Sequence, residues 1–204
     1  MTLAAFLSIV AIHLAAAISP GPSFVVCLRI AARDGFRTAA ALALGFGLGA
    51  ALWATAAMAG LALLFQLVPA LFTALKLIGA AFLIWIAISM WRHAGDPLEM
   101  PEDGTPALTR ARAFRLGFLT FATNPKTAVF FGAVFVGLVP PGTPLPWLAA
   151  IVAAIFVNET LWYLLVARLF STERARAGYS RLKSAVDRGF AGLLTLFGLR
   201  IALG

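Results

Sequence analysis

The stretch Ser19-Pro20-Gly21-Pro22 interrupts an apolar segment, residues 3–28, that otherwise has the composition of a membrane-spanning helix. Proline has no backbone N–H and glycine weakens a helix, so three such residues in a row end one helix and begin another. Asn124-Pro125 interrupts the apolar segment 114–139 in a similar way. In both places a short polar residue precedes a proline, which is typical of an N-cap followed by the first helical residue. Ser19 and Asn124 are therefore the predicted N-caps.

The composition is that of a membrane protein. Hydrophobic residues make up 62% of the 204 residues and charged residues 12%, against roughly 25% charged residues in a soluble domain. Apolar segments long enough to cross about 30 Å of hydrocarbon are predicted spans. There are six: 3–28, 39–64, 70–91, 114–139, 147–168 and 188–203. The predicted fold is an all-α polytopic membrane protein with six transmembrane helices, of which the first and fourth are broken.

The first ten residues, the single cysteine and the two histidines exclude several classes of protein and site. The opening MTLAAFLSIV has no Lys or Arg, unlike the basic start of a cleavable signal peptide, so the first apolar segment is expected to remain as a span. Cys27 is the single cysteine, which excludes an internal disulfide and a paired-thiol redox site. Two histidines are too few for a clustered metal site, so no metal and no cofactor is predicted.

The basic residues predict the orientation of the chain. Of the sixteen Lys and Arg, all but Lys76, Lys126 and Arg200 lie around three alternating connections, which follow the first, third and fifth spans. Lys and Arg are enriched in cytoplasmic loops, so these connections are predicted to be cytoplasmic and both termini periplasmic. The topology explains the net charge of +8, and no nucleic-acid partner is predicted.

The chain divides into two halves of three predicted spans: residues 1–95 and 114–204, joined by a polar cytoplasmic linker, 96–113. Because three is odd, the second half enters the membrane in the opposite orientation, which makes a 3+3 inverted repeat. The two broken spans occupy equivalent positions in the halves. Each break lies nine or ten residues from a cytoplasmic arginine, roughly 13–15 Å along a helix, so both breaks are predicted near the membrane midplane.

The paired breaks predict a binding site within the membrane. A helix start presents unpaired N–H groups and about half a positive charge, so two starts that face each other favour an anionic group. Lys126 adds a full charge beside the second break, and a substrate carboxylate is the expected ligand. The predicted substrate-binding residues are Ser19, Pro20, Gly21, Pro22, Ser23, Asn124, Pro125, Lys126, Glu159 and Trp162.

Glu159 is the acidic residue deepest in a predicted span, at a depth close to that of Lys126. Inserting a charged side chain at that depth of the membrane costs about 2.5–3.5 kcal/mol, which favours a functional role for Glu159. Glu159 is predicted to meet a substrate ammonium or to carry a proton, and a purely structural ion pair with Lys126 is the alternative. Trp162, about one helical turn later, is predicted to wall the cavity, with packing as the alternative. His13 is a second proton-coupling candidate because imidazole titrates near neutral pH; its alternative is a hydrogen-bonded structural role.

Three motifs together resemble the LysE/RhtB superfamily of bacterial amino-acid exporters: Ser-Pro-Gly-Pro at 19–22, Arg33-Asp-Gly35 before a Gly45-x-x-x-Gly49 helix, and Asn124-Pro125-Lys126. The resemblance extends over essentially the whole chain, through Trp162-Tyr163 and the spacing of Gly192 and Gly198. One departure is Ala39, where such proteins often have glycine. The resemblance implies secondary active efflux of amino acids from the cytoplasm across the inner membrane to the periplasm, driven by protons.

One acid and one base in the predicted site suit a zwitterionic neutral amino acid, such as homoserine or threonine, better than lysine or arginine. An exporter of another small solute or a metal ion is an alternative, but a metal site would want more Cys, His or acidic residues. An intramembrane enzyme is a further alternative, but it would want a nucleophile turn with a histidine partner. No catalytic residue is predicted, and the chain is not expected to be an enzyme. Its surroundings are membrane lipid, and the sequence is compatible with a homo-oligomer.

Overall fold

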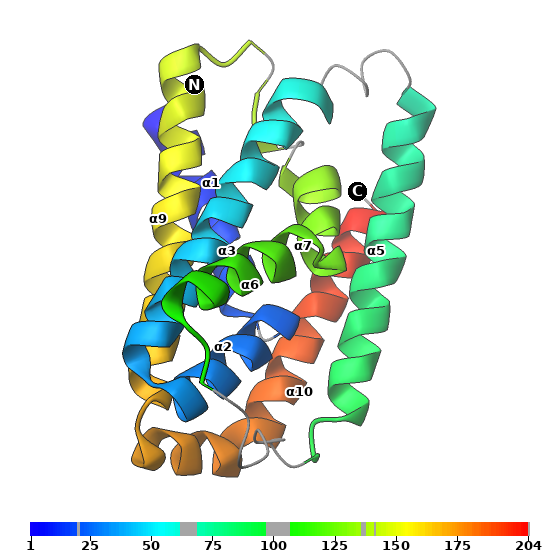
Figure 1. The fold of residues 1–204 in the computed structure, drawn as a ribbon. Helices are drawn as coiled ribbons and strands as arrows, with labels where there is room; N and C mark the ends of the chain where they lie inside the picture. The colour runs from blue at the N-terminus through cyan, green and yellow to red at the C-terminus, as the bar shows by residue number, and fades with distance from the viewer. Residues whose placement is uncertain (20, 62–68, 97–106, 136–137, 141, 204) are drawn as a thin grey trace.

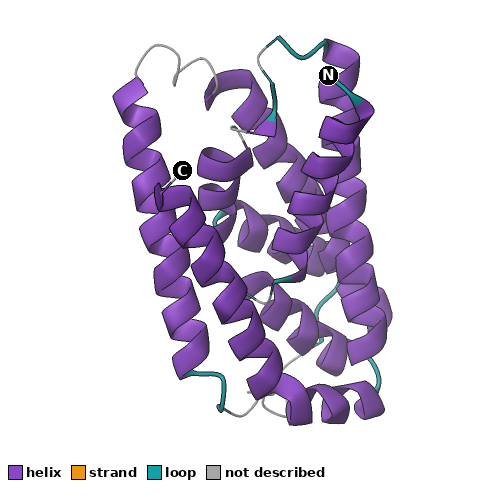
Figure 2. Cartoon of the chain, turned by 180° about the vertical axis from the view of Figure 1, so that it is seen from behind, coloured by secondary structure: helices purple, strands orange, loops and turns teal. Residues whose placement is uncertain are grey.

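The computed structural model describes residues 1–19, 21–61, 69–96, 107–135, 138–140 and 142–203. Within these ranges every regular element is helical (Figures 1 and 2), as the all-α prediction requires. The α-helices are α1 (Leu3–Ile18), α2 (Pro22–Asp34), α3 (Phe36–Ala56), α5 (Pro69–Arg92), α6 (Arg110–Ala122), α7 (Pro125–Val129), α9 (Leu145–Phe170) and α10 (Glu173–Leu203). Two π-helical segments, η1 (Ala57–Leu61) and η2 (Phe130–Phe135), continue α3 and α7.

Both predicted helix breaks are present. The axes of α1 and α2 are bent by 62° at the first break, and α6 ends three residues before α7 begins at the second. Asn124 is the N-cap of α7, as predicted: its Oδ1 accepts a hydrogen bond from the backbone N–H of Lys126 at 3.0 Å. Each of the two spans predicted to be broken therefore contains separate, shorter helices.

The prediction of Ser19 as an N-cap is wrong. Ser19 is the C-cap of α1, whereas Gly21 is the N-cap of α2 and Pro22 is its first helical residue. The second proline of the motif starts the helix because a proline disfavours the α conformation in the residue before it. Gly21 accordingly has extended backbone angles, with φ −170° and ψ −170°.

The last helix is longer than the predicted span 188–203. α10 begins at Glu173, so basic residues that were expected in a loop lie on its first turns, which cross the lower end of the bundle in Figure 1. This part is amphipathic and polar, so a search for apolar segments misses it. Its buried Asp187 accepts a hydrogen bond from Lys183 Nζ at 2.8 Å, and Nζ also reaches the His93 carbonyl after α5 at 3.1 Å. Burial, and Asp187 beside it, raise the pKa of Tyr179 above the ordinary value of a phenol.

α3 packs closely against α6 and α9, and glycines make this close approach possible. A Cβ at Gly45 would collide with the backbone carbonyl of Phe114 on α6, and a Cβ at Gly47 with the Thr160 hydroxyl on α9. On α6, a Cβ at Gly117 would collide with the Leu42 carbonyl of α3. The Gly45-x-x-x-Gly49 pattern is therefore part of a helix-contact surface.

Two helices in the described ranges are long and apolar enough to cross a membrane, Phe36–Gly60 and Leu145–Phe170, and the bent pair of α1 and α2 makes a third if it counts as one span. The six-span inverted repeat therefore stays a prediction. Both helices carry apolar side chains on their outer faces, for example Leu44 and Leu48 on α3 and Leu161 and Leu165 on α9, all at least 44% exposed. An apolar outer surface of this kind is suited to lipid. The end of α2, the end of α5 and the α9–α10 junction, which carry the predicted cytoplasmic charges, lie at one end of the bundle in Figure 1.

Candidate functional site

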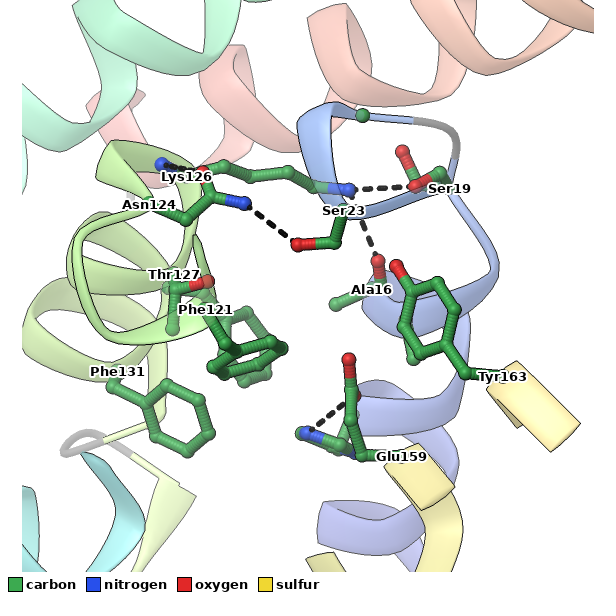
Figure 3. Close-up of a pocket in the computed structure, with 14 residues that line it drawn as sticks. Ala16, Ser19, Ser23, Phe121, Asn124, Lys126, Thr127, Phe131, Glu159 and Tyr163 are labelled. Carbon is green, nitrogen blue, oxygen red and sulfur yellow. Dashed lines mark hydrogen bonds and ion pairs between the residues drawn. The ribbon is translucent and has the colours of Figure 1, made fainter. Parts of the chain in front are cut away.

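A cavity lies where the two helix breaks meet (Figure 3). Its walls come from α1, the start of α2, the end of α6, α7, η2 and α9, so the fold brings together residues more than a hundred positions apart. The lining residues are His13, Ala16, Ala17, Ser19, Gly21, Ser23, Phe121, Asn124, Lys126, Thr127, Phe130, Phe131, Glu159 and Tyr163. Most of the predicted site residues are among them: His13, Ser19, Gly21, Ser23, Asn124, Lys126 and Glu159.

The other four predicted residues are not among the described residues that line the cavity. Pro22 and Pro125 begin α2 and α7 beside the cavity, and Pro20 lies outside the described residues. Trp162 does not line the cavity; its half-buried side chain packs against the hydrophobic core. The aromatic wall on α9 is instead Tyr163, which is only 4% exposed.

The two breaks touch through Asn124. Its Nδ2 donates to the Ser23 hydroxyl at 3.2 Å, while its Oδ1 caps the first turn of α7. Ser23 lies in the first turn of α2, and both side chains are buried. One amide therefore joins the starts of α2 and α7, as the prediction of adjacent helix starts requires.

Lys126 points from α7 to the end of α1. Its Nζ donates to the carbonyl oxygens of Ser19 at 2.8 Å and of Ala16 at 3.1 Å (Figure 3). The last carbonyls of a helix have no partner within the helix, and the negative end of the helix dipole favours a cation there. An ammonium has three N–H donors. The described residues engage two of them, so the third N–H of Lys126 has no partner among the residues that the structure describes.

Glu159 lies across the cavity from Lys126 and is 2% exposed. Its Oε2 is 3.5 Å from Nε2 of His13, whose ring packs against Phe130 and Phe131 with centroids 5.7 and 5.9 Å away. Among the described residues there is no ion pair between Glu159 and Lys126. The cavity therefore contains a buried acid, Glu159, and a partly buried base, Lys126, that do not form an ion pair with each other.

Several lining residues were missed from the sequence. Tyr163 is four residues after Glu159 and on the same helix face, so its spacing could have identified it as readily as it did Trp162. Thr127 and the phenylalanines of η2 carry no such indication, because in an apolar span they cannot be told from packing residues. Phe130 and Phe131 lie in the π-helical segment η2, which the sequence does not predict, and Thr127 lies in α7.

Comparison with known proteins relates the chain to a family of translocators. The LysE type translocator family matches residues 14–204. The threonine efflux protein of Escherichia coli (strain K12) is 33% identical over 203 residues, 97% of each chain. The threonine efflux protein of Salmonella typhi is 31% identical over 210 residues, again 97% of each chain.

A further relative is the homoserine/homoserine lactone efflux protein of Salmonella typhi, 32% identical over 127 residues, which are 62% of this chain and 61% of that protein. No solved structure has significant similarity to the chain. Family and relatives are transport proteins of bacteria and not enzymes. Given a match that begins in α1 and runs to the last residue, this chain belongs to the LysE type translocator family.

Proposed function

We propose that this chain is a secondary active exporter that carries a neutral amino acid from the cytoplasm to the periplasm across the bacterial inner membrane in exchange for protons. One observation carries the proposal. Lys126 and Glu159 line the same cavity at opposite sides and do not pair with each other. A zwitterion has the complementary charges, and each buried charge needs a partner of opposite sign.

In the loaded state the carboxylate of the amino acid accepts a hydrogen bond from the remaining N–H of Lys126. The start of α2 supports this interaction, because the N-cap Gly21 offers no side chain to the first N–H groups of the helix. The ammonium of the amino acid meets Glu159. A cargo such as lysine would bring a second positive charge, and Glu159 is the single acidic side chain among the described residues of the cavity wall.

A hydroxyl-bearing cargo is favoured within this class. The named activities of the relatives are efflux of threonine and of homoserine, both neutral amino acids with a hydroxyl group. The cavity wall contains hydroxyl groups at Ser19, Ser23, Thr127 and Tyr163. The Ser19 Oγ is buried and has no hydrogen-bond partner among the described residues, and an unpaired buried hydroxyl gains from a new partner. Threonine and homoserine are therefore the proposed substrates.

Proton coupling follows if Glu159 is occupied either by a proton or by the cargo ammonium. Either one neutralises the buried carboxylate, and leaving it bare in an apolar wall is costly. The carrier would then cross back with a proton on Glu159 after it has released the amino acid. This alternation exchanges one cargo molecule for at least one proton.

The test uses everted membrane vesicles, in which export appears as uptake into the lumen. With an acidic lumen, we expect accumulation of radiolabelled threonine or homoserine that collapses when a protonophore is added. Glu159→Gln removes the charge but keeps the shape, so it should abolish accumulation driven by the proton gradient. Downhill exchange of unlabelled for labelled amino acid should be retained in part, because the amide can still hydrogen-bond the cargo ammonium.

A panel of amino acids, other small solutes and divalent metal ions in the same vesicles decides the substrate class. Uptake of a metal ion or of another solute in place of amino acids would overturn the proposal. So would threonine accumulation that is unchanged in both Glu159→Gln and Lys126→Met, because no part of the assigned site would then be needed.

A further inference from the structure

Asn158 connects α9 to α1 next to Glu159, outside the lining of the cavity. Its Nδ2 is 3.1 Å from the backbone oxygen of Val10 and 3.2 Å from Nδ1 of His13. The other ring nitrogen of His13, Nε2, is 3.5 Å from the Glu159 carboxylate. The three side chains thus form a row, Asn158, His13 and Glu159, that leads into the cavity.

The Val10 carbonyl fixes the orientation of the Asn158 amide. A carbonyl oxygen only accepts hydrogen bonds, so the NH₂ group and not the amide oxygen must face it. The second hydrogen of the same NH₂ group then faces Nδ1 of His13. Nδ1 must therefore accept, which means that it carries no proton.

A neutral imidazole carries one proton, and here that proton must be on Nε2, which faces Glu159. A second proton on His13 would have to go to Nδ1, where it would meet the N–H of Asn158. The ring of His13 also packs against Phe130 and Phe131, and His13 is 2% exposed. A proton that enters the row is thereby directed to the carboxylate of Glu159.

We infer that Asn158 is a positioning residue that holds His13 as the neutral Nε2–H tautomer, so that the exchangeable proton of the site resides on Glu159. When Glu159 takes up the proton it becomes a neutral carboxylic acid, and His13 is neutral before and after. The titratable groups that face this pair are Lys126 from α7 and Tyr163 from α9, both in the wall of the same cavity. The inference rests on the proposed function for its role in transport, but the tautomer can be measured independently.

The measurement is nitrogen-15 NMR of histidine-labelled protein in lipid bilayers at neutral pH. The chain has two histidines, so His93→Gln, an exposed position at the end of α5, leaves His13 as the single labelled ring. We expect the shift of a protonated nitrogen at Nε2 and of an unprotonated one at Nδ1. In Asn158→Asp the carboxylate accepts a hydrogen bond, so Nδ1 should become protonated.

A ring protonated at Nδ1 in the protein with native Asn158 would overturn the inference, and this result does not depend on whether any Asn158 variant folds. An Asn158→Asp protein with an unchanged histidine spectrum would overturn it as well. Asn158→Leu removes the donor, and we expect proton-driven uptake to fall by roughly tenfold, as for loss of one buried hydrogen bond between neutral groups, with downhill exchange less affected. If the tautomer is as expected but Lys126→Met and Glu159→Gln transport normally, the proposed function fails and the positioning role of Asn158 stands.

Discussion

At the scale of single residues, Lys126 has two tasks that can be separated by experiment. Its ammonium satisfies carbonyl oxygens at the interrupted end of α1, and it supplies the positive charge of the cavity. The first task concerns stability, and the second is the contribution to ligand binding that we propose. Lys126 is the single lysine or arginine among the described residues of the cavity wall, so one ammonium has to serve both tasks.

Lys126→Met should impair both tasks. The carbonyls of Ala16 and Ser19 lose their donor, which should destabilise the fold by about 1–3 kcal/mol, and amino-acid export should fall below detection in vesicles matched for folded protein. Lys183→Met is the control, because its ammonium lies outside the cavity and bonds Asp187. It should lower the melting temperature in detergent while transport per folded molecule remains. Equal transport by the two variants would show that the charge at residue 126 is not used on cargo.

The residues that could be predicted from the sequence are those whose chemistry is conspicuous in an apolar span. Lys126 and Glu159 are charged where charge is expensive, and Asn124 precedes a proline, so each can be recognised from its immediate neighbours. Tyr163 and Asn158 cannot be chosen in this way, because their partners lie on other helices: Phe46 of α3 contacts the ring of Tyr163, and His13 of α1 contacts Asn158. Their geometry is a product of tertiary structure, and the sequence alone offers only the helical spacing from Glu159.

At the scale of the elements, the fold depends on where helices stop and on how closely they cross. The sequence predicts both breaks, because proline fits the first turn of a helix but costs a backbone hydrogen bond in its interior. It places the N-cap of α2 wrongly because two prolines compete for the same role and only backbone geometry decides between them. It also misses the first turns of α10, since a polar helix at the membrane surface lacks the apolar composition by which spans are found.

The crossing of α3 and α6 gives a prediction for Gly117. Gly117→Ala places a Cβ against the backbone oxygen of Leu42, which cannot move without shifting α3. We expect a loss of several degrees in the melting temperature and poor recovery of folded protein. Gly192→Ala is the matched control in α10, where a Cβ meets nothing within 4 Å, and it should be neutral or slightly stabilising. A Gly117→Ala protein as stable as the control would mean that the two helices lie farther apart.

At the scale of the whole molecule, the distribution of basic residues predicts both termini on the periplasmic side. Cys27 is the single cysteine and is buried, so Cys27→Ala provides a background for labelling. In intact cells a membrane-impermeant maleimide should label Thr2→Cys and spare Thr172→Cys, which lies in the predicted cytoplasmic connection. Everted vesicles should reverse the pattern. The same label at both positions from one side would contradict the six-span inverted arrangement.

The bonds from Lys126 to the end of α1 have a consequence for release. Main-chain oxygens already accept hydrogen bonds from two of the three N–H groups of the ammonium, so an acid group that bonds the third N–H can gain a second bond only by displacing one of these oxygens. A cargo that displaces the carbonyl oxygen of Ala16 or Ser19 from the ammonium must compensate for the lost hydrogen bond. Re-forming that bond then favours release of the cargo. Such an exporter would bind its cargo weakly even though the site is charged. Weak binding suits release into a compartment where the cargo accumulates.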